Sequence, residues 1–168
     1  MLFRCGPQFK MKRYRYFWII GIIFADQLLK AYIRSTMYIG QSIPVIKDFF
    51  HITYVQNRGG AFSIFSGHGM ILVVIPLAAI IVAVWYMETH RDAHWSLFGA
   101  LCLIIAGGVG NLADRMIFGF VTDMFDFRFF PVFNIADIAV CVGAGFMILY
   151  TFVYSSPSRS EDQEGTGA

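Results

Sequence analysis

Three uninterrupted apolar stretches of the chain are long enough to cross a bilayer. Residues 70–87 contain no charged side chain, and the same holds for 95–113. The third stretch covers 131–154, where Asp137 is the only charge. A membrane helix needs about 20 mostly apolar residues. The pattern therefore predicts membrane spans over 70–87, 95–114 and 131–154.

A fourth span is predicted near the N-terminus, where the apolar run 16–25 is too short by itself. It reaches spanning length only by continuing through Asp26 and Lys30, which gives a predicted helix over 14–34. Basic residues before an apolar run also describe a cleaved signal peptide. No small-residue cleavage site follows the run and Asp26 comes instead, so a retained helix is the prediction.

The connection between the first two spans, residues 37–67, has the pattern of strands. Residues 51–55 are β-branched and aromatic, 58–60 contain two glycines, and 61–65 resume the apolar pattern. Such a run around a glycine turn indicates a hairpin. The fold class predicted is an all-α membrane protein with four transmembrane helices and a small β-sheet between helices 1 and 2. An apolar sheet of this kind can hold part of a lipid or an extended peptide.

The composition agrees with a membrane protein of one domain. The 168 residues are 57% hydrophobic and only 14% charged, against roughly 25% charge in soluble domains. We therefore predict one membrane domain over 1–154 and a disordered tail over 155–168, which is rich in Ser, Gly and acids. A net charge of +2 is too small to indicate a nucleic-acid partner.

Basic residues near the spans predict the orientation. Five of them precede the first span, which places the N-terminus in the cytoplasm: Arg4, Lys10, Lys12, Arg13 and Arg15. Four spans return the C-terminus and the tail to the cytoplasm. The connections 34–69 and 114–128 then lie on the outer side, and 88–94 lies on the inner side.

Polar residues gather where this topology places the outer ends of the spans. Asp123 and Asp137 are two acids at a similar depth, and two carboxylates that meet share a proton and can work as acid and base. Ionisable groups in a membrane are functional candidates by default. The group consists of Asp26, Lys30, Asn57, Asn111, Asp114, Arg115, Asp123, Asn134 and Asp137.

Structural interpretations compete with the functional one for several of these residues. Asp26 and Lys30, four apart on one helix face, form an ion pair in the structural interpretation. Asn111 and Asn134 are also suited to hydrogen bonds between helices, and Asp114 to anchoring a helix end. Asp126 has the pattern of an exposed loop acid.

His90 and His94 have metal-ligand spacing but no third ligand, so neither a metal site nor a cofactor is predicted.

Five motifs in one order give the chain a resemblance to a known family. They are 26–30 (DQLLK), 57–62 (NRGGAF), 110–115 (GNLADR), 121–127 (VTDMFDF) and 133–137 (FNIAD). In this order they resemble bacterial lipoprotein signal peptidase, also called signal peptidase II. Two departures are small: Gly60 stands where alanine is usual and Met124 where phenylalanine is common. The glycines before Asn111 do not form the Gly-x-Gly-Asp motif of presenilin-type proteases.

The resemblance implies an aspartyl endopeptidase of the bacterial cytoplasmic (inner) membrane. Its substrate would be a prolipoprotein held in membrane lipid, cut just before a cysteine that carries diacylglycerol, with a globomycin-type inhibitor in the same site. Asp123 and Asp137 match the catalytic positions. The implied supporting or substrate-binding residues are Asp26, Lys30, Asn57, Asn111, Arg115 and Asn134. The alternative from the residues alone is a small proton-coupled transporter or channel that uses the same carboxylates.

Overall fold

The computed structural model describes residues 14–59, 70–90 and 94–154, which contain four long helices and three strands. In chain order they are α1 (Arg15–Thr36), β1 (Ser42–Ile46), β2 (Phe50–Asn57), α2 (Ile71–Thr89), α3 (Trp95–Phe118), β3 (Val121–Asp126) and α4 (Ile135–Tyr154). All four helices are long and apolar enough to cross a membrane. The prediction of a mostly helical membrane protein with a small sheet is confirmed.

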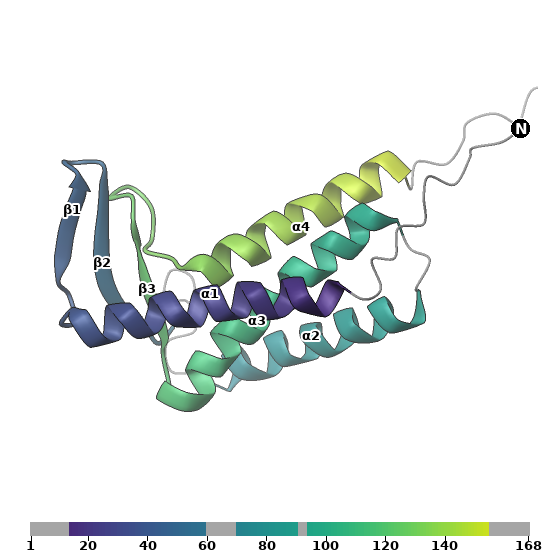
Figure 1. The fold of residues 1–168 in the computed structure, drawn as a ribbon, viewed down its shortest axis with the longest axis horizontal. Coiled ribbons are helices and arrows are strands. Elements are labelled where there is room, and N and C mark those ends of the chain that lie inside the picture. Colours follow the sequence, from purple (N-terminus) through teal and green to yellow (C-terminus); the bar gives the residue numbers. More distant parts are fainter. Residues whose placement is uncertain (1–13, 60–69, 91–93, 155–168) are drawn as a thin grey trace, which may run out of the picture.

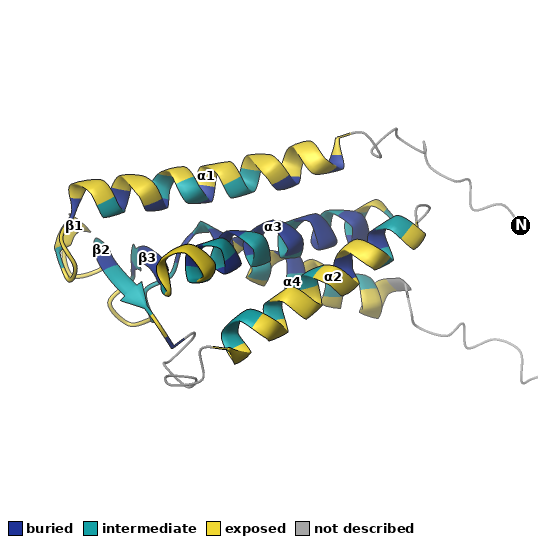
Figure 2. Cartoon of the chain, turned by 90° about the horizontal axis from the view of Figure 1, so that it is seen from below, coloured by how far each residue is buried: buried dark blue, intermediate teal, exposed yellow. Residues whose placement is uncertain are grey.

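The helices run side by side with the sheet at one end, and the start of α1 and the end of α4 lie at the opposite end (Figure 1). α3 is the central helix. It packs against α1, α2 and α4, and it is the most buried of the helices (Figure 2). The outward faces of α1, α2 and α4 are exposed and apolar. A helix whose outward face is hydrophobic is suited to a lipid environment rather than to water.

The sheet contains a strand that was not anticipated. Its order is β1-β2-β3 and both pairings are antiparallel. β3 comes from the connection between α3 and α4, and its Asp123 pairs with Val55 of β2. The expected strand at 61–65 lies outside the described residues. The sheet is therefore built from two connections, and the second one brings Asp123 to β2.

α3 and α4 approach closely through small residues. A methyl group added at Gly107 would lie 2.2 Å from the carbonyl oxygen of Ala136, and one at Gly143 would lie 2.8 Å from that of Ala100. Small residues at such crossings let helix backbones come together in a membrane. This contact brings the first turn of α4, which carries Asp137, against α3.

α3 continues beyond the expected end at residue 114 and reaches Phe118. Gly119 ends it in the left-handed conformation (φ 75°), and its N–H donates to the carbonyl of Arg115. A glycine accepts this conformation without strain, which is the usual way to stop a helix. The chain then turns directly into β3.

Candidate active site

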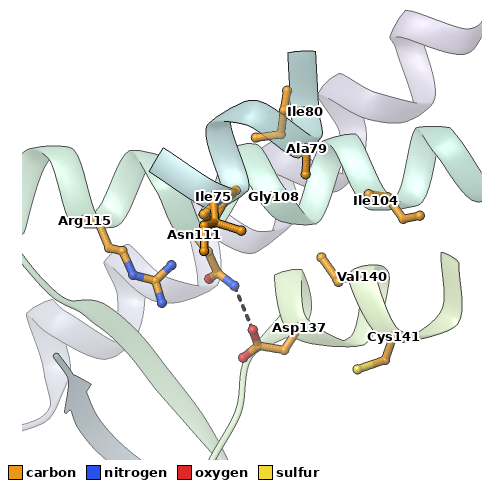
Figure 3. Close-up of a pocket in the computed structure, with 11 residues that line it drawn as sticks. Ile75, Ala79, Ile80, Ile104, Gly108, Asn111, Arg115, Asp137, Val140 and Cys141 are labelled. Atoms are coloured by element: carbon orange, nitrogen blue, oxygen red, sulfur yellow. Dashed lines mark hydrogen bonds between the residues drawn. The ribbon is translucent and has the colours of Figure 1, made fainter. Parts of the chain in front are cut away.

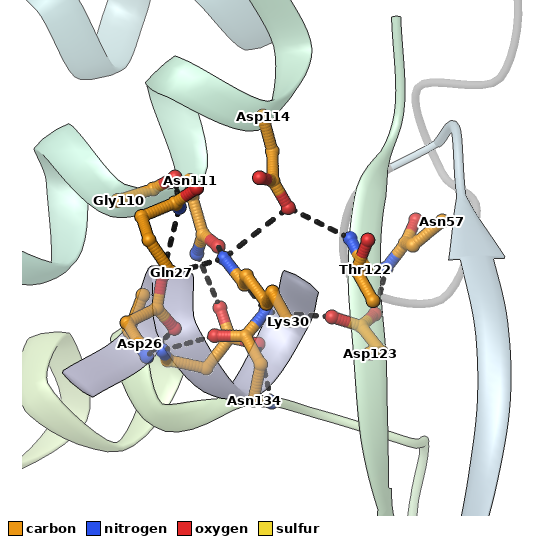
Figure 4. A network of polar contacts seen from close by, with 12 residues as sticks. Asp26, Gln27, Lys30, Asn57, Gly110, Asn111, Asp114, Thr122, Asp123 and Asn134 are labelled. Atoms are coloured by element: carbon orange, nitrogen blue, oxygen red, sulfur yellow. Dashed lines mark hydrogen bonds and ion pairs between the residues drawn. The ribbon is translucent and has the colours of Figure 1, made fainter. Parts of the chain in front are cut away.

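The predicted site residues meet where the sheet joins the helices (Figure 4). α1 provides one positive charge of the site, that of Lys30. Lys30 is fully buried, and its Nζ lies 2.9 Å from Asp26 Oδ2 and 3.4 Å from Asp114 Oδ2. A buried ammonium is tolerated only when it is paired and hydrogen-bonded. The ion pair expected between Asp26 and Lys30 is present.

Asp26 also reaches the start of α4. Its Oδ1 accepts the backbone N–H of Ala136 at 3.0 Å. The first N–H groups of a helix have no partner within the helix, and a carboxylate there also faces the positive end of the helix dipole. Asp26 thus joins α1 to the first turn of α4.

Asn134 and Asp137 form a reciprocal cap at the same helix end. Asn134 Oδ1 accepts the N–H of Asp137 at 3.0 Å, and Asp137 Oδ2 accepts the N–H of Asn134 at 3.2 Å. This is the arrangement of a capping box, in which two otherwise unpaired N–H groups are satisfied together. The cap fixes the direction of the Asp137 carboxylate before any substrate is present.

Asn111 of α3 connects Lys30 with Asp137. Lys30 can only donate, so the amide oxygen of Asn111 faces its Nζ at 2.9 Å. The amide nitrogen must then point the other way, and it donates to Asp137 Oδ1 at 2.7 Å. Lys30 therefore sets the orientation of the amide that holds Asp137.

Asp123 receives two amide donors of its own. Asn134 Nδ2 donates to its Oδ1 at 2.6 Å, and Asn57 Nδ2 donates to its Oδ2 at 3.0 Å. Asn134 therefore contacts both acids, Asp123 through its side chain and Asp137 through its backbone. All four carboxyl oxygens of the two acids accept a hydrogen bond from an asparagine.

The surroundings of Asp123 disfavour its charge. Its side chain is 1% exposed, and burial, followed by the nearby charge of Asp137, raises its pKa to about 7. The hydrogen bonds from Asn57 and Asn134 act in the opposite direction. Since two close carboxylates do not ionise independently, the pair retains a proton near neutral pH.

A pocket of about 300 Å³ opens beside Asp137 between α2, α3 and α4 (Figure 3). Asn111, Arg115 and Asp137 provide its polar end, and the guanidinium of Arg115 points toward the pocket. The rest of the lining is mainly apolar: Ile75, Pro76, Ala79, Ile80, Ile104, Gly108, Val140 and Cys141. The pocket can thus hold an apolar group with one end at Asp137.

The interpretation of Asp126 as an exposed loop acid is wrong. Asp126 lies at the end of β3 and is 5% exposed. It accepts hydrogen bonds from Thr53 Oγ1 at 2.8 Å and from Arg128 Nη1 at 3.0 Å. Burial opposes its charge, but these bonds outweigh burial and hold its pKa below the ordinary value. Its partners are on β2 and the following turn, away from Asn134.

Several residues of the site were missed or underrated from the sequence. Asp114, expected to anchor a helix end, is fully buried against Lys30 and Arg34. Thr122 and Arg34 were not singled out, although both contact Asp114 and they also contact each other. Gln27 donates to the carbonyl of Gly110 at 3.0 Å. A polar residue at the core-facing position of an apolar helix is the only signal that could have found Arg34.

Comparison with known proteins shows to which family this chain belongs. A model of "Signal peptidase (SPase) II" matches residues 18–153. The chain belongs to the signal peptidase II family. The protein is therefore a peptidase of the aspartic type, and the transporter alternative is set aside. With four apolar helices, it is a multi-pass protein of the bacterial inner membrane.

Individual relatives cover most of the chain. The lipoprotein signal peptidase of Halothermothrix orenii is 43% identical over 136 residues, which are 80% of this chain and 92% of that protein. That of Clostridioides difficile is 42% identical over 84% of this chain and 96% of its own length. A solved structure of a bacterial membrane enzyme, obtained by the in meso method, is 30% identical with a TM-score of 0.79, over 90% of this chain and 94% of that one.

Proposed function

We propose that this signal peptidase II removes the signal peptides of lipoprotein precursors, by hydrolysis of the bond before a cysteine that carries diacylglycerol. Asp123 and Asp137 are the catalytic acid–base pair in this proposal. The observation that carries it is the position of Asn134, which binds Asp123 through its amide and Asp137 through its backbone. Asn134 thereby links an acid of β3 to an acid of α4, and Asp137 lies at the polar end of the apolar pocket.

The pair supplies what peptide hydrolysis needs. The ionised carboxylate takes a proton from water, and the resulting hydroxide attacks the peptide carbonyl. The protonated carboxyl donates to the carbonyl oxygen, and collapse of the intermediate returns a proton to the departing amine. The raised pKa of Asp123 keeps one acid protonated near neutral pH, which supports this division of work.

The surrounding residues have supporting roles. Asn57 holds Asp123, and Asn111 holds Asp137. Lys30 orients Asn111, and Asp26 compensates the charge of Lys30 while capping α4. Arg115 reaches the pocket beside Asp137, where its guanidinium is available to a substrate carbonyl or lipid ester.

The apolar lining of the pocket supports a lipidated substrate. Acyl chains or apolar signal-peptide side chains can occupy the part formed by α2 and α4, while the scissile bond lies at the acids. A cyclic peptide inhibitor of the globomycin type occupies the same site in this proposal.

The test is cleavage of a precursor by the purified protein in detergent. A diacylglyceryl-modified precursor should be cut before its modified cysteine, and the unmodified precursor should not. Asp123→Asn and Asp137→Asn should each lower the rate by about 10²–10⁴-fold or more, the contribution typical of a general acid or base.

Asp126→Asn is the matched control, since it makes the same change on the same strand. It should retain most of the activity, because Asp126 contacts neither Asn134 nor the pocket. Near wild-type cleavage by Asp123→Asn or Asp137→Asn would refute the assignment of the pair. Loss of activity in Asp126→Asn alone would move the assignment to that residue.

A further inference from the structure

Thr122, the residue before Asp123, is held at both its backbone and its side chain. Its N–H donates to Asp114 Oδ2 at 3.0 Å, and its Oγ1 accepts from Arg34 Nη1 at 2.9 Å. Thr122 and Asp114 are fully buried. Two helices, α1 and α3, thus fix one residue of β3.

The anchor is itself well supported. Arg34 Nη1 lies 3.4 Å from Asp114 Oδ1, and Lys30 Nζ lies 3.4 Å from Asp114 Oδ2. The Arg34 guanidinium also lies 4.3 Å from the centre of the Phe118 ring, which restricts its direction. Asp114 is therefore compensated by two cations, and it remains an acceptor for the Thr122 N–H.

The geometry of a strand transmits this anchor to Asp123. Successive side chains of a strand point to opposite faces. Thr122 accordingly contacts Arg34, while Asp123 contacts Asn57 and Asn134 (Figure 4). On one edge β3 pairs with β2, and on the other the Thr122 N–H goes to α3. Fixing Thr122 therefore fixes the rotation of the strand about its axis, and with it the direction of the Asp123 carboxyl.

We propose that Thr122 and Arg34 are positioning residues for catalysis, which hold β3 in the rotation that aims Asp123 at Asn134 and Asp137. This inference rests on the proposed catalytic role of Asp123. It assigns a function to two side chains that touch neither the pocket nor the reacting atoms.

The decisive variant is Thr122→Val, which keeps the shape of the side chain and removes the acceptor for Arg34. We expect kcat for the lipidated precursor to fall by about tenfold to hundredfold, because a small misplacement of a reacting group costs that much. KM should change by less than about twofold, since the pocket is untouched. Thr122→Ser keeps the hydroxyl and should restore most of the rate.

The pH profile separates positioning from a loss of stability. Asn57 and Asn134 favour the charged form of Asp123, and the charged groups around it are Asp137 of α4, Lys30 of α1 and Arg115 of α3. If the strand rotates, the two asparagine bonds weaken, and the alkaline limb of the profile should move to higher pH in Thr122→Val. A change that only lowers the melting temperature would leave this limb in place.

Thr53→Val is the matched control, since it removes a hydroxyl from the neighbouring strand whose partners are Asp126 and Ser42, outside the proposed site. It should leave kcat and the pH profile unchanged. If Thr122→Val does not fold, Arg34→Met decides, because Arg34 is 18% exposed and its loss removes the same bond.

Unchanged kcat and pH profile in a folded Thr122→Val, or in Arg34→Met where Thr122→Val fails to fold, overturn the inference. Asp123→Asn is measured in the same assay. If it is inactive while the positioning variants are normal, only the positioning inference fails. If Asp123→Asn remains active, the proposed catalytic pair itself fails.

Discussion

Asp123 is an acid whose surroundings oppose its charge, while Asp126, three residues later on the same strand, is an acid whose surroundings favour it. Both are buried. Asp123 faces a second acid, and its pKa is raised to about 7. Asp126 faces Thr53 and Arg128, and its pKa is lowered. At the scale of single residues, burial and a second acid raise the pKa of Asp123, whereas at Asp126 the donors on Thr53 and Arg128 outweigh burial.

This contrast predicts opposite effects on stability. A raised pKa means that the folded state binds the proton more tightly than the unfolded state, so stability falls as the pH rises from about 4 to about 7. Asp123→Asn removes this loss. The melting temperature of Asp123→Asn relative to the wild type should therefore increase between pH 4 and pH 8, as measured in detergent.

Asp126→Asn is the internal control, and it should show the reverse. The lowered pKa of Asp126 makes its charged form stabilising, so the contribution is present at neutral pH and is lost as the pH falls through the folded value. Its variant should be most destabilised at neutral pH. Parallel pH dependences for the two variants would contradict the assigned surroundings.

At the scale of elements, the crossing of α3 and α4 sets the position of Asp137. The backbone of Ala136, next to Asp137, lies where a methyl group on Gly107 would be. Since the obstructing atom is backbone, it cannot turn away as a side chain can. The close approach of these two helices is therefore part of the active-site geometry.

Gly107→Ala should consequently move the first turn of α4 and cost about 1–3 kcal/mol of stability, as overpacking usually does. Cleavage should also fall, because Asp137 moves with Ala136. Gly99→Ala on the same helix is the control, since a methyl group there meets nothing within 4 Å. Thermal unfolding and cleavage rates of the two variants check this, and equal behaviour would argue against a tight crossing.

At the scale of the whole molecule, the sheet lies at one end of the four helices (Figure 1), and the polar site lies where the sheet joins them (Figure 4). The basic residues before α1 belong to the other end of the first span. Because basic residues favour the cytoplasmic side, we propose that both termini are cytoplasmic and that the site faces outward. Water can then reach the acids while acyl chains stay in lipid.

Labelling of single cysteines tests this orientation in a variant without the three native cysteines. Cysteines placed at Ser42 and Phe127 should react with an impermeant thiol reagent added to intact cells. Cysteines placed at Asp92 and Ser160 should react only after the cells are opened. Labelling at position 92 from outside would invert the orientation and place the acids in the cytoplasm.

The sequence alone determined the features that depend on local spacing. Uncharged runs of about 20 residues define spans, because every backbone polar group in lipid must be satisfied within a helix. The four-residue spacing of Asp26 and Lys30 predicts their ion pair, because such residues are neighbours on a helix surface. The roles of Asp123 and Asp137 were predicted from family motifs and stay a prediction.

Only the tertiary structure decided which distant segments meet. β3 is a short strand, and its partner β2 lies more than 60 residues earlier, so no local pattern specified the pairing that buries Asp126. The contact of Arg34 with Thr122 joins residues 88 positions apart. Strand pairing and buried polar contacts are non-local, and a sequence pattern records only that a residue is polar, not which partner compensates it.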